Sequence, residues 1–139
     1  MIDFNYKKTE KKKIMIVDDT AIMVRNIKNI LGDKYTVFYA TSGEQALHII
    51  PEKEPDLILL DYKMPGMDGK QVYEEMLKDE DMKDIPVIFL TSTADEKTIL
   101  SILATKPAGY ILKPANQADL LEKISACLEN AEKAKKDNP

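Results

Sequence analysis

Short apolar runs rich in β-branched residues alternate along the chain with longer stretches that have the period of an α-helix. Five such runs have the character of β-strands, and they are Ile14 to Val17, Thr36 to Ala40, Leu57 to Leu60, Val87 to Leu90, and Tyr110 to Leu112. Strict alternation of strand and helix predicts an α/β fold with a parallel sheet. The continuously apolar runs predict that helices cover both faces of that sheet.

Each strand is followed by a helical pattern with its own start signal or apolar stripe. The first stripe consists of Ile22, Met23, Ile27, Ile30 and Leu31, and later helices open near Ser42, Asp68, Asp95 and Asn116. Because crossovers between parallel strands are right-handed, few topologies remain. We expect a single doubly wound, five-stranded parallel sheet flanked by five helices, with the flavodoxin-like strand order 2-1-3-4-5.

Length and composition exclude several classes of protein. The 139 residues suit one domain, which we expect at 13–130, between a lysine-rich tail at 1–12 and a polar tail or linker at 131–139. The single Cys127 excludes an internal disulfide, and with one histidine it excludes zinc sites built from these residue types alone. The net charge of −4 argues against direct binding of nucleic acid.

Neither a membrane span nor a signal peptide is visible in the sequence. No apolar run approaches the ~20 residues that a membrane span needs, and the lysine-rich start lacks the apolar stretch of a signal peptide. These observations favour a cytoplasmic protein that does not contact a membrane. Met1 slightly favours a stand-alone protein over a domain cut from a longer one, and both alternatives stay open.

Reactive side chains stand where four of the five predicted strands end. Asp18 and Asp19 follow the first strand, Asp61 the third, Thr91 the fourth and Lys113 the fifth. Because the carboxyl ends of parallel strands meet at one edge of a sheet, we expect these side chains to lie close together. Any one of the acids is explained equally well as a helix cap or turn residue, but four matching strand ends are not.

Such a cluster of acids needs a cation. Two carboxylates ~4 Å apart repel each other by about 4 kcal/mol at an effective dielectric constant near 20. One lysine cannot neutralise three acids, whereas a divalent ion can, and ligation by oxygen alone favours Mg²⁺, or Mn²⁺, over Zn²⁺. Lys113 and Thr91 are suited to the oxygens of a phosphoryl group, toward which a neighbouring carboxylate can act as nucleophile.

Together these residues give the chain a resemblance to the receiver domain of bacterial two-component response regulators. The resemblance covers about residues 12 to 130. The matching segments are Asp18-Asp19, Asp61, Met64-Pro65-Gly66-Met67-Asp68-Gly69, Thr91-Ser92, and Tyr110-Ile111-Leu112-Lys113-Pro114. Each segment alone is a weak signal, but their combination is highly specific.

The resemblance implies a phosphoryl acceptor and a metal site. Asp61 would accept a phosphoryl group from the phosphohistidine of a histidine kinase or phosphotransfer protein, or from a small donor. Mg²⁺ would bind Asp19 and Asp61 directly, Asp18 mainly through water, and the backbone carbonyl of Lys63. The protein would catalyse its own phosphorylation and dephosphorylation but act mainly as a signalling switch, so its status as an enzyme stays open.

The resemblance also implies how the signal leaves the site. Lys113 would hold a phosphoryl oxygen, with a cis peptide bond to Pro114. Thr91 would turn to the phosphoryl group while Tyr110 rotates inward behind it, and small Ser92 would leave room for the donor. The output surface would be the face of the fourth helix, fifth strand and fifth helix, acting on an unknown downstream protein. A dimer that forms on phosphorylation stays open.

Three positions depart from the family pattern or vary within it. Ala115 stands where the family usually has a larger residue, which bears on packing at the output surface. Lys63 and Thr93 occupy positions that, in the family, influence how fast the phosphoryl group is hydrolysed. Our hypothesis is that the Lys63 side chain reaches over the phosphoryl group and changes its lifetime.

Three alternatives belong to other classes of function. A Mg²⁺-dependent phosphohydrolase of the haloacid-dehalogenase type uses similar residues, but in the opposite chain order and usually with a cap domain. A nucleotide- or flavin-binding module lacks support, because no Gly-x-Gly-x-x-Gly or Walker-type motif is present. A degenerate receiver that only binds partners is disfavoured, because every expected site position is filled.

Overall fold

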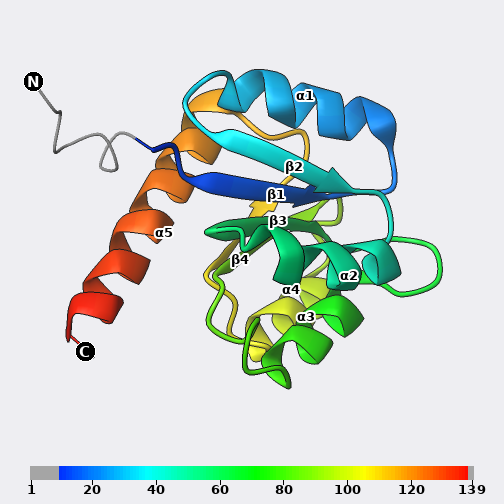
Figure 1. Ribbon diagram of the computed structural model, residues 1–139. Coiled ribbons are helices and arrows are strands. Elements are labelled where there is room, and N and C mark those ends of the chain that lie inside the picture. Colours follow the sequence, from blue (N-terminus) through cyan, green and yellow to red (C-terminus); the bar gives the residue numbers. More distant parts are fainter. Residues whose placement is uncertain (1–9, 138–139) are drawn as a thin grey trace, which may run out of the picture.

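The computed structural model describes residues 10–137, so most of the tail expected at 1–12 lies outside the described residues. Strands and helices alternate as the sequence predicts (Figure 1). In chain order they are β1 (Lys13–Val17), α1 (Ala21–Leu31), β2 (Thr36–Ala40), α2 (Gly43–Lys53), β3 (Leu57–Asp61), α3 (Gly69–Leu77), β4 (Val87–Thr91), α4 (Glu96–Ala104), β5 (Gly109–Leu112) and α5 (Gln117–Asp137).

The five strands form one sheet in the order β2-β1-β3-β4-β5, which confirms the expected topology. All neighbouring strands are parallel. The order reverses direction at β1, which has β2 on one side and β3 on the other, and ligands of such sheets bind beyond the carboxyl ends of the strands at this point. The register pairs Val17 with Leu60 and Asp61 with Leu90. The carboxyl ends of β1, β3 and β4 therefore lie beside one another at the same edge of the sheet.

Two apolar layers enclose the sheet. Consecutive residues of a strand point to opposite faces, and accordingly Met15 packs in one layer and Ile16 in the other. The first layer includes buried residues of α2, α3 and α4, and the second includes those of α1 and α5. Figure 1 shows α1 above the sheet and α2, α3 and α4 below it. The sheet is thereby fixed from both sides, which gives the strand ends a rigid base.

The buried stripe of α1 differs from the prediction at its start. Ile22 is 71% exposed, whereas Val24, which the predicted stripe leaves out, is 7% exposed. The inward face of α1 is set by Val24, Ile27 and Leu31, which follow one another at helical spacing. Ile22 lies about 200° around the helix from Val24, since each residue advances the helix by about 100°, and it therefore faces outward.

Helix α5 continues past the expected domain end at residue 130. Residues 131–137, which we expected as a polar tail or linker, are helical. An ion pair of 2.6 Å between Lys12 Nζ and Glu132 Oε1 ties this extension to the start of β1. The extension borders a groove of about 880 Å³ at the amino edge of the sheet, whose lining includes Ile50, Pro51, Glu54, Pro55, Asp81, Asp84, Ile85, Pro86, Ala131, Ala134 and Lys135.

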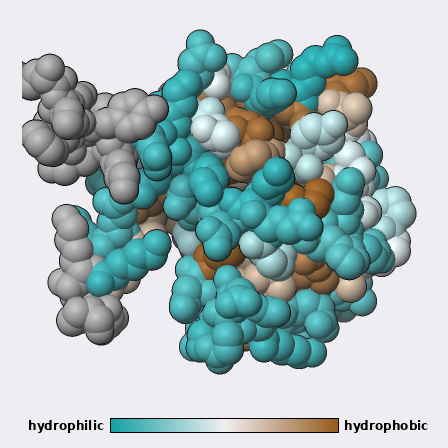
Figure 2. All heavy atoms as spheres, viewed as in Figure 1, coloured by the Kyte–Doolittle hydropathy of each residue, from teal (hydrophilic) through white to brown (hydrophobic). Residues whose placement is uncertain are grey.

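The surface is mostly polar. On the face shown in Figure 2, hydrophobic residues lie in separate small patches among hydrophilic ones. Within residues 10–137, no helix has both the length and the apolar character needed to cross a bilayer.

Candidate functional site

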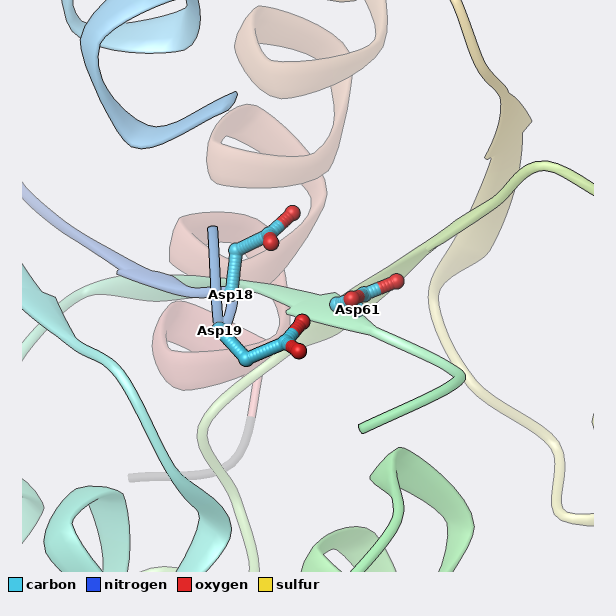
Figure 3. Close-up of side chains that lie close together, drawn as sticks. All are labelled: Asp18, Asp19 and Asp61. Atoms are coloured by element: carbon cyan, nitrogen blue, oxygen red, sulfur yellow. The ribbon is translucent and has the colours of Figure 1, made fainter. Parts of the chain in front are cut away.

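The three acids expected at the strand ends come together. Asp18 and Asp19 directly follow β1, and Asp61 is the last residue of β3. One carboxylate oxygen from each lies within 4.8 Å of the others. Figure 3 shows the three carboxylates gathered on one side of the strand ends. Asp18 and Asp61 are buried, while Asp19 is exposed, so the cluster is open to solvent on one side.

Lys113 joins two of the acids. Its Nζ lies 2.9 Å from Asp18 Oδ2 and 3.0 Å from Asp61 Oδ1. The lysine follows β5, and its backbone N–H donates to the carbonyl oxygen of Thr91 at 2.8 Å, which holds the two strand ends side by side. The peptide bond between Lys113 and Pro114 is cis, as the resemblance implied.

Burial and charge shift the acid–base behaviour of this group. Burial raises the pKa of Asp61 to about 6, with the negative charges of Asp18 and Asp19 adding to the effect and the hydrogen bond from Lys113 opposing it. For Lys113, burial lowers the pKa, but its hydrogen bonds to Asp18 and Asp61 outweigh burial and raise it. The lysine is therefore held as a cation, and it balances only part of the negative charge.

Thr91 ends β4 beside the acids, and it is buried. Its hydroxyl accepts a hydrogen bond of 3.2 Å from the backbone N–H of Thr93. Tyr110 lies on β5 opposite Phe89 of β4, and its half-buried ring packs against the core layer of α2, α3 and α4. Thr91 and Tyr110 thus lie on neighbouring strands, and Tyr110 pairs with the residue two positions before Thr91.

The loop from β3 to α3 wraps closely around Asp61. The N–H of Gly69 donates to the carbonyl oxygen of Tyr62 at 2.9 Å, and a Cβ atom at Gly69 would overlap the backbone carbonyl oxygen of Asp61. Only glycine fits this approach. Asp68 caps α3 in a full capping box, which confirms the predicted helix start. Lys63 is exposed at the beginning of this loop.

Two further positions are placed as follows. Ser92 is exposed directly after Thr91, while Ala115 is half-buried against the core layer of α1 and α5.

Thr20 was not predicted from the sequence as a site residue, but its backbone N–H and its hydroxyl both donate to Asp18 Oδ1 at 2.9 Å. The only signal for it was a hydroxyl residue two positions after an acid, which is common in turns.

The acidic cluster fits a hard divalent cation. Its donors are all carboxylate oxygens, one of them exposed and two buried, and they lie close enough together to share one ion. Three carboxylates converge here and Lys113 supplies one positive charge to them, which leaves an excess of negative charge. A divalent cation would remove this excess, so the residues present are compatible with the Mg²⁺ that receiver domains generally bind.

The chain is similar in sequence to response regulators. The family model of the response regulator receiver domain matches residues 14–125. Chemotaxis protein CheY-3 of Vibrio cholerae is 34% identical over 119 residues, 84% of this chain and 92% of that protein. The probable transcriptional regulator ycf27 of Porphyridium aerugineum is 34% identical over 132 residues, 93% of this chain and 53% of that protein. The chain thus spans about half the length of its ycf27 relatives.

Solved structures agree with the sequence matches. The CheY-like response regulator receiver domain protein of Methanospirillum hungatei has a TM-score of 0.82 and 32% identity, covering 90% of this chain and 99% of that one. The receiver domain of a histidine kinase from Syntrophus aciditrophicus has a TM-score of 0.79 and 28% identity, covering 86% of this chain and 91% of that one. The chain is a receiver domain and belongs to the response regulator receiver family.

Proposed function

We propose that this receiver takes a phosphoryl group onto Asp61 from a phosphohistidine of a histidine kinase or phosphotransfer protein. The observation that carries the proposal is the bridge of Lys113 between Asp18 and Asp61, at an edge where three carboxylates converge. Membership of the receiver family argues against the phosphohydrolase alternative, whose residues occur in a different chain order.

Asp61 would act as the nucleophile. Lys113 donates to Oδ1, and among the described residues none donates to Oδ2. An oxygen of Asp61 would attack the phosphorus in line with the bond to be broken. The O–P bond forms as the P–N bond breaks, and the imidazole leaves with the electron pair of that bond and takes a proton from solvent. Lys113 would then pair with a phosphoryl oxygen.

Asp19 and Asp61 would hold Mg²⁺ directly, together with the backbone carbonyl of Lys63, and Mn²⁺ could replace it. When bound, the ion supplies positive charge for the phosphoryl oxygens. Both oxygens of Asp18 already accept hydrogen bonds, one from Lys113 and the other from Thr20, so Asp18 would act mainly through water. This division of roles follows from which carboxylate oxygens are already occupied.

Phosphorylation would be signalled through Thr91 and Tyr110. Thr91, whose hydroxyl now accepts from the N–H of Thr93, would turn to the phosphoryl group, and Tyr110 on the neighbouring strand would rotate inward behind it. The proposed output surface exposes apolar side chains that a partner would cover, namely Leu100 and Leu103 of α4 and Leu112 of β5. We propose that this surface binds an unknown downstream protein in the cytoplasm.

The test is labelling with acetyl phosphate and Mg²⁺. Mass spectrometry should show one added phosphoryl group, and Asp61→Asn should abolish it. Asp84→Asn is the matched control, because it removes an exposed carboxylate at the opposite edge of the sheet. Absence of labelling of the intact chain by acetyl phosphate and by histidine kinases would favour a degenerate receiver, and turnover of many equivalents would favour a phosphatase.

The lifetime of the phosphoryl group is a separate proposal. Lys63 is exposed at the start of the β3–α3 loop, two residues after the acceptor, and we propose that its side chain reaches over the phosphoryl group. Decay of phosphorylated Asp61 should therefore proceed at a different rate in Lys63→Ala, and Lys70→Ala in α3 serves as the control. An unchanged half-life in Lys63→Ala would refute this role.

A further inference from the structure

The first residue before α1 departs from the capping pattern of the helices that follow. Ser42, Asp68 and Asp95, which precede α2, α3 and α4, each accept a hydrogen bond from the backbone N–H three residues later. Thr20 occupies the same position before α1, but its side chain makes no such bond within the described part of the chain. Thr20 is of a residue type that commonly caps a helix, but here its side chain does not cap α1.

The Thr20 side chain turns back to the acidic cluster. Its hydroxyl and its backbone N–H both donate to Asp18 Oδ1 at 2.9 Å. The other oxygen of Asp18, Oδ2, accepts from Lys113 Nζ at 2.9 Å, and the same Nζ donates to Asp61 Oδ1 at 3.0 Å. A continuous series of hydrogen bonds thus runs from the start of α1 to the proposed phosphoryl acceptor.

This series restricts the orientation of Asp18. The residue is 0% exposed, and hydrogen bonds to an ionised carboxylate are short and strong. With Oδ1 bound twice by Thr20, rotation of the carboxylate would break two bonds. Oδ2 is therefore directed at Lys113, and the ammonium group is held against Asp61.

We propose that Thr20 is a positioning residue, which fixes Asp18 and through it aims the ammonium group of Lys113 at Asp61. The effect on phosphoryl transfer rests on the proposed function, but the effect on the side chains does not. Within the described residues, Thr20 donates no hydrogen bond to Lys113 or Asp61, so its influence on both passes through Asp18.

The variants separate the hydroxyl from the rest of the side chain. Thr20→Val removes the hydroxyl but keeps the shape of the side chain and the backbone N–H, and Thr20→Ser restores a hydroxyl. Thr41→Val is the matched control. Thr41 follows β2 at the same edge of the sheet, and its hydroxyl bonds Gln45 Oε1 at 3.1 Å rather than an acid of the cluster.

The first measurement uses the unphosphorylated protein. NMR resonances of the Asp18 carboxyl carbon and of the Lys113 side chain should shift in Thr20→Val, return toward wild type in Thr20→Ser, and stay unchanged in Thr41→Val. Amide hydrogen exchange at Met23, the third residue of α1, should be unchanged in Thr20→Val. Faster exchange at Met23 with unchanged Asp18 and Lys113 resonances would show an ordinary cap and overturn the proposal.

The second measurement is the rate of phosphorylation at fixed acetyl phosphate and Mg²⁺ concentrations. Loss of one hydrogen bond that positions the site should lower this rate about fivefold in Thr20→Val, with Thr20→Ser near wild type. A rate equal to wild type in Thr20→Val would overturn the proposal. If the wild-type chain is not phosphorylated at all, the proposed function fails, while the resonances of Asp18 and Lys113 still decide the role of Thr20.

Discussion

The two edges of the sheet use acidic residues in opposite ways. At the carboxyl edge, one carboxylate oxygen from each of Asp18, Asp19 and Asp61 lies within 4.8 Å of the others. At the amino edge, Glu54, Asp81 and Asp84 line an open groove, and no described residue forms an ion pair with them. Acids placed apart in water repel weakly, whereas crowded and buried acids repel strongly. The carboxyl edge is therefore arranged to bind positive charge, at a cost to the stability of the fold.

An acid at the amino edge can also serve the fold directly. Asp56 accepts a hydrogen bond of 2.8 Å from the backbone N–H of Lys13, which joins the segment before β3 to the first residue of β1. Its carboxylate satisfies a strand end that would otherwise lack a partner. Function and stability are thus divided between the two ends of the same strands.

The largest effect is expected from removing the cation at the crowded edge. Lys113→Met leaves Asp18 and Asp61 without the ammonium group that bridges them, so the free energy of unfolding should fall by about 3 kcal/mol. Unfolding by urea at neutral pH in the presence of EDTA measures this difference in the free energy of unfolding. Lys135→Met beside the groove is the control and should change stability by less than about 0.5 kcal/mol. Equal losses in both variants would remove the contrast between the edges.

Adding Mg²⁺ should stabilise the carboxyl edge alone. At roughly ten times the dissociation constant, a ligand of the folded state raises the free energy of unfolding by about 1.4 kcal/mol. We expect this gain in wild type and in Asp84→Asn, a much smaller gain in Asp19→Asn, and reversal by EDTA. Thermal unfolding with and without Mg²⁺ measures it, and an equal gain in Asp19→Asn would place the ion elsewhere.

Replacing Asp61 should relieve repulsion at high pH. The pKa of Asp61 is about 6 in the metal-free folded state, chiefly because of burial, and about 3.9 in an unfolded chain. The folded state binds this proton more tightly, so the resulting stability is complete below pH 4 and is lost as the pH rises through 6. Asp61→Asn should therefore be about 1 kcal/mol more stable than wild type at pH 7.5, since partial exposure to solvent reduces the cost of burying the charge.

Urea unfolding between pH 4 and 8 in EDTA measures the effect of Asp61→Asn, and its difference from wild type should shrink toward the acid end. A variant that is less stable than wild type at pH 7.5 would contradict this electrostatic account of the carboxyl edge.

The smallest effect is expected at the groove. Asp81→Asn and Asp84→Asn each remove an exposed charge that no described residue pairs with, so stability should stay within about 0.5 kcal/mol of wild type at every pH tested. Thermal unfolding is sufficient as a measurement. A gain as large as that of Asp61→Asn would mean that the amino edge is crowded as well.

Much of the architecture and the location of the acids could be predicted from the sequence. A strand buried on both faces is apolar throughout, so its end is marked where Asp18 or Asp61 interrupts the run. Parallel order then places these ends together. The direction of the Thr20 hydroxyl could not be predicted, because capping a helix and binding an upstream acid both begin from the same residue type at the same position.

Sequence patterns report polarity and not contacts, which limits the prediction of two segments. Ile22 is apolar and near the helical stripe of α1, yet it faces outward, because the stripe is wide enough to fit more than one set of residues. Residues 131–137 are polar, so the sequence indicates a tail or linker there, while the structure continues α5 through them with the strong helix formers alanine, lysine and glutamate. In both cases the geometry of neighbouring elements decides the outcome.

Helix α5 is long enough to extend from the carboxyl edge of the sheet to beyond the amino edge. Twenty-one residues make a rod of about 30 Å, and its first turn stands shortly after Lys113 and Pro114. A tilt of about 10° at that turn would carry the far end through about 5 Å. A displacement at the acidic edge that tilted α5 in this way would move its far end by more than an atomic diameter, beyond the opposite edge of the sheet.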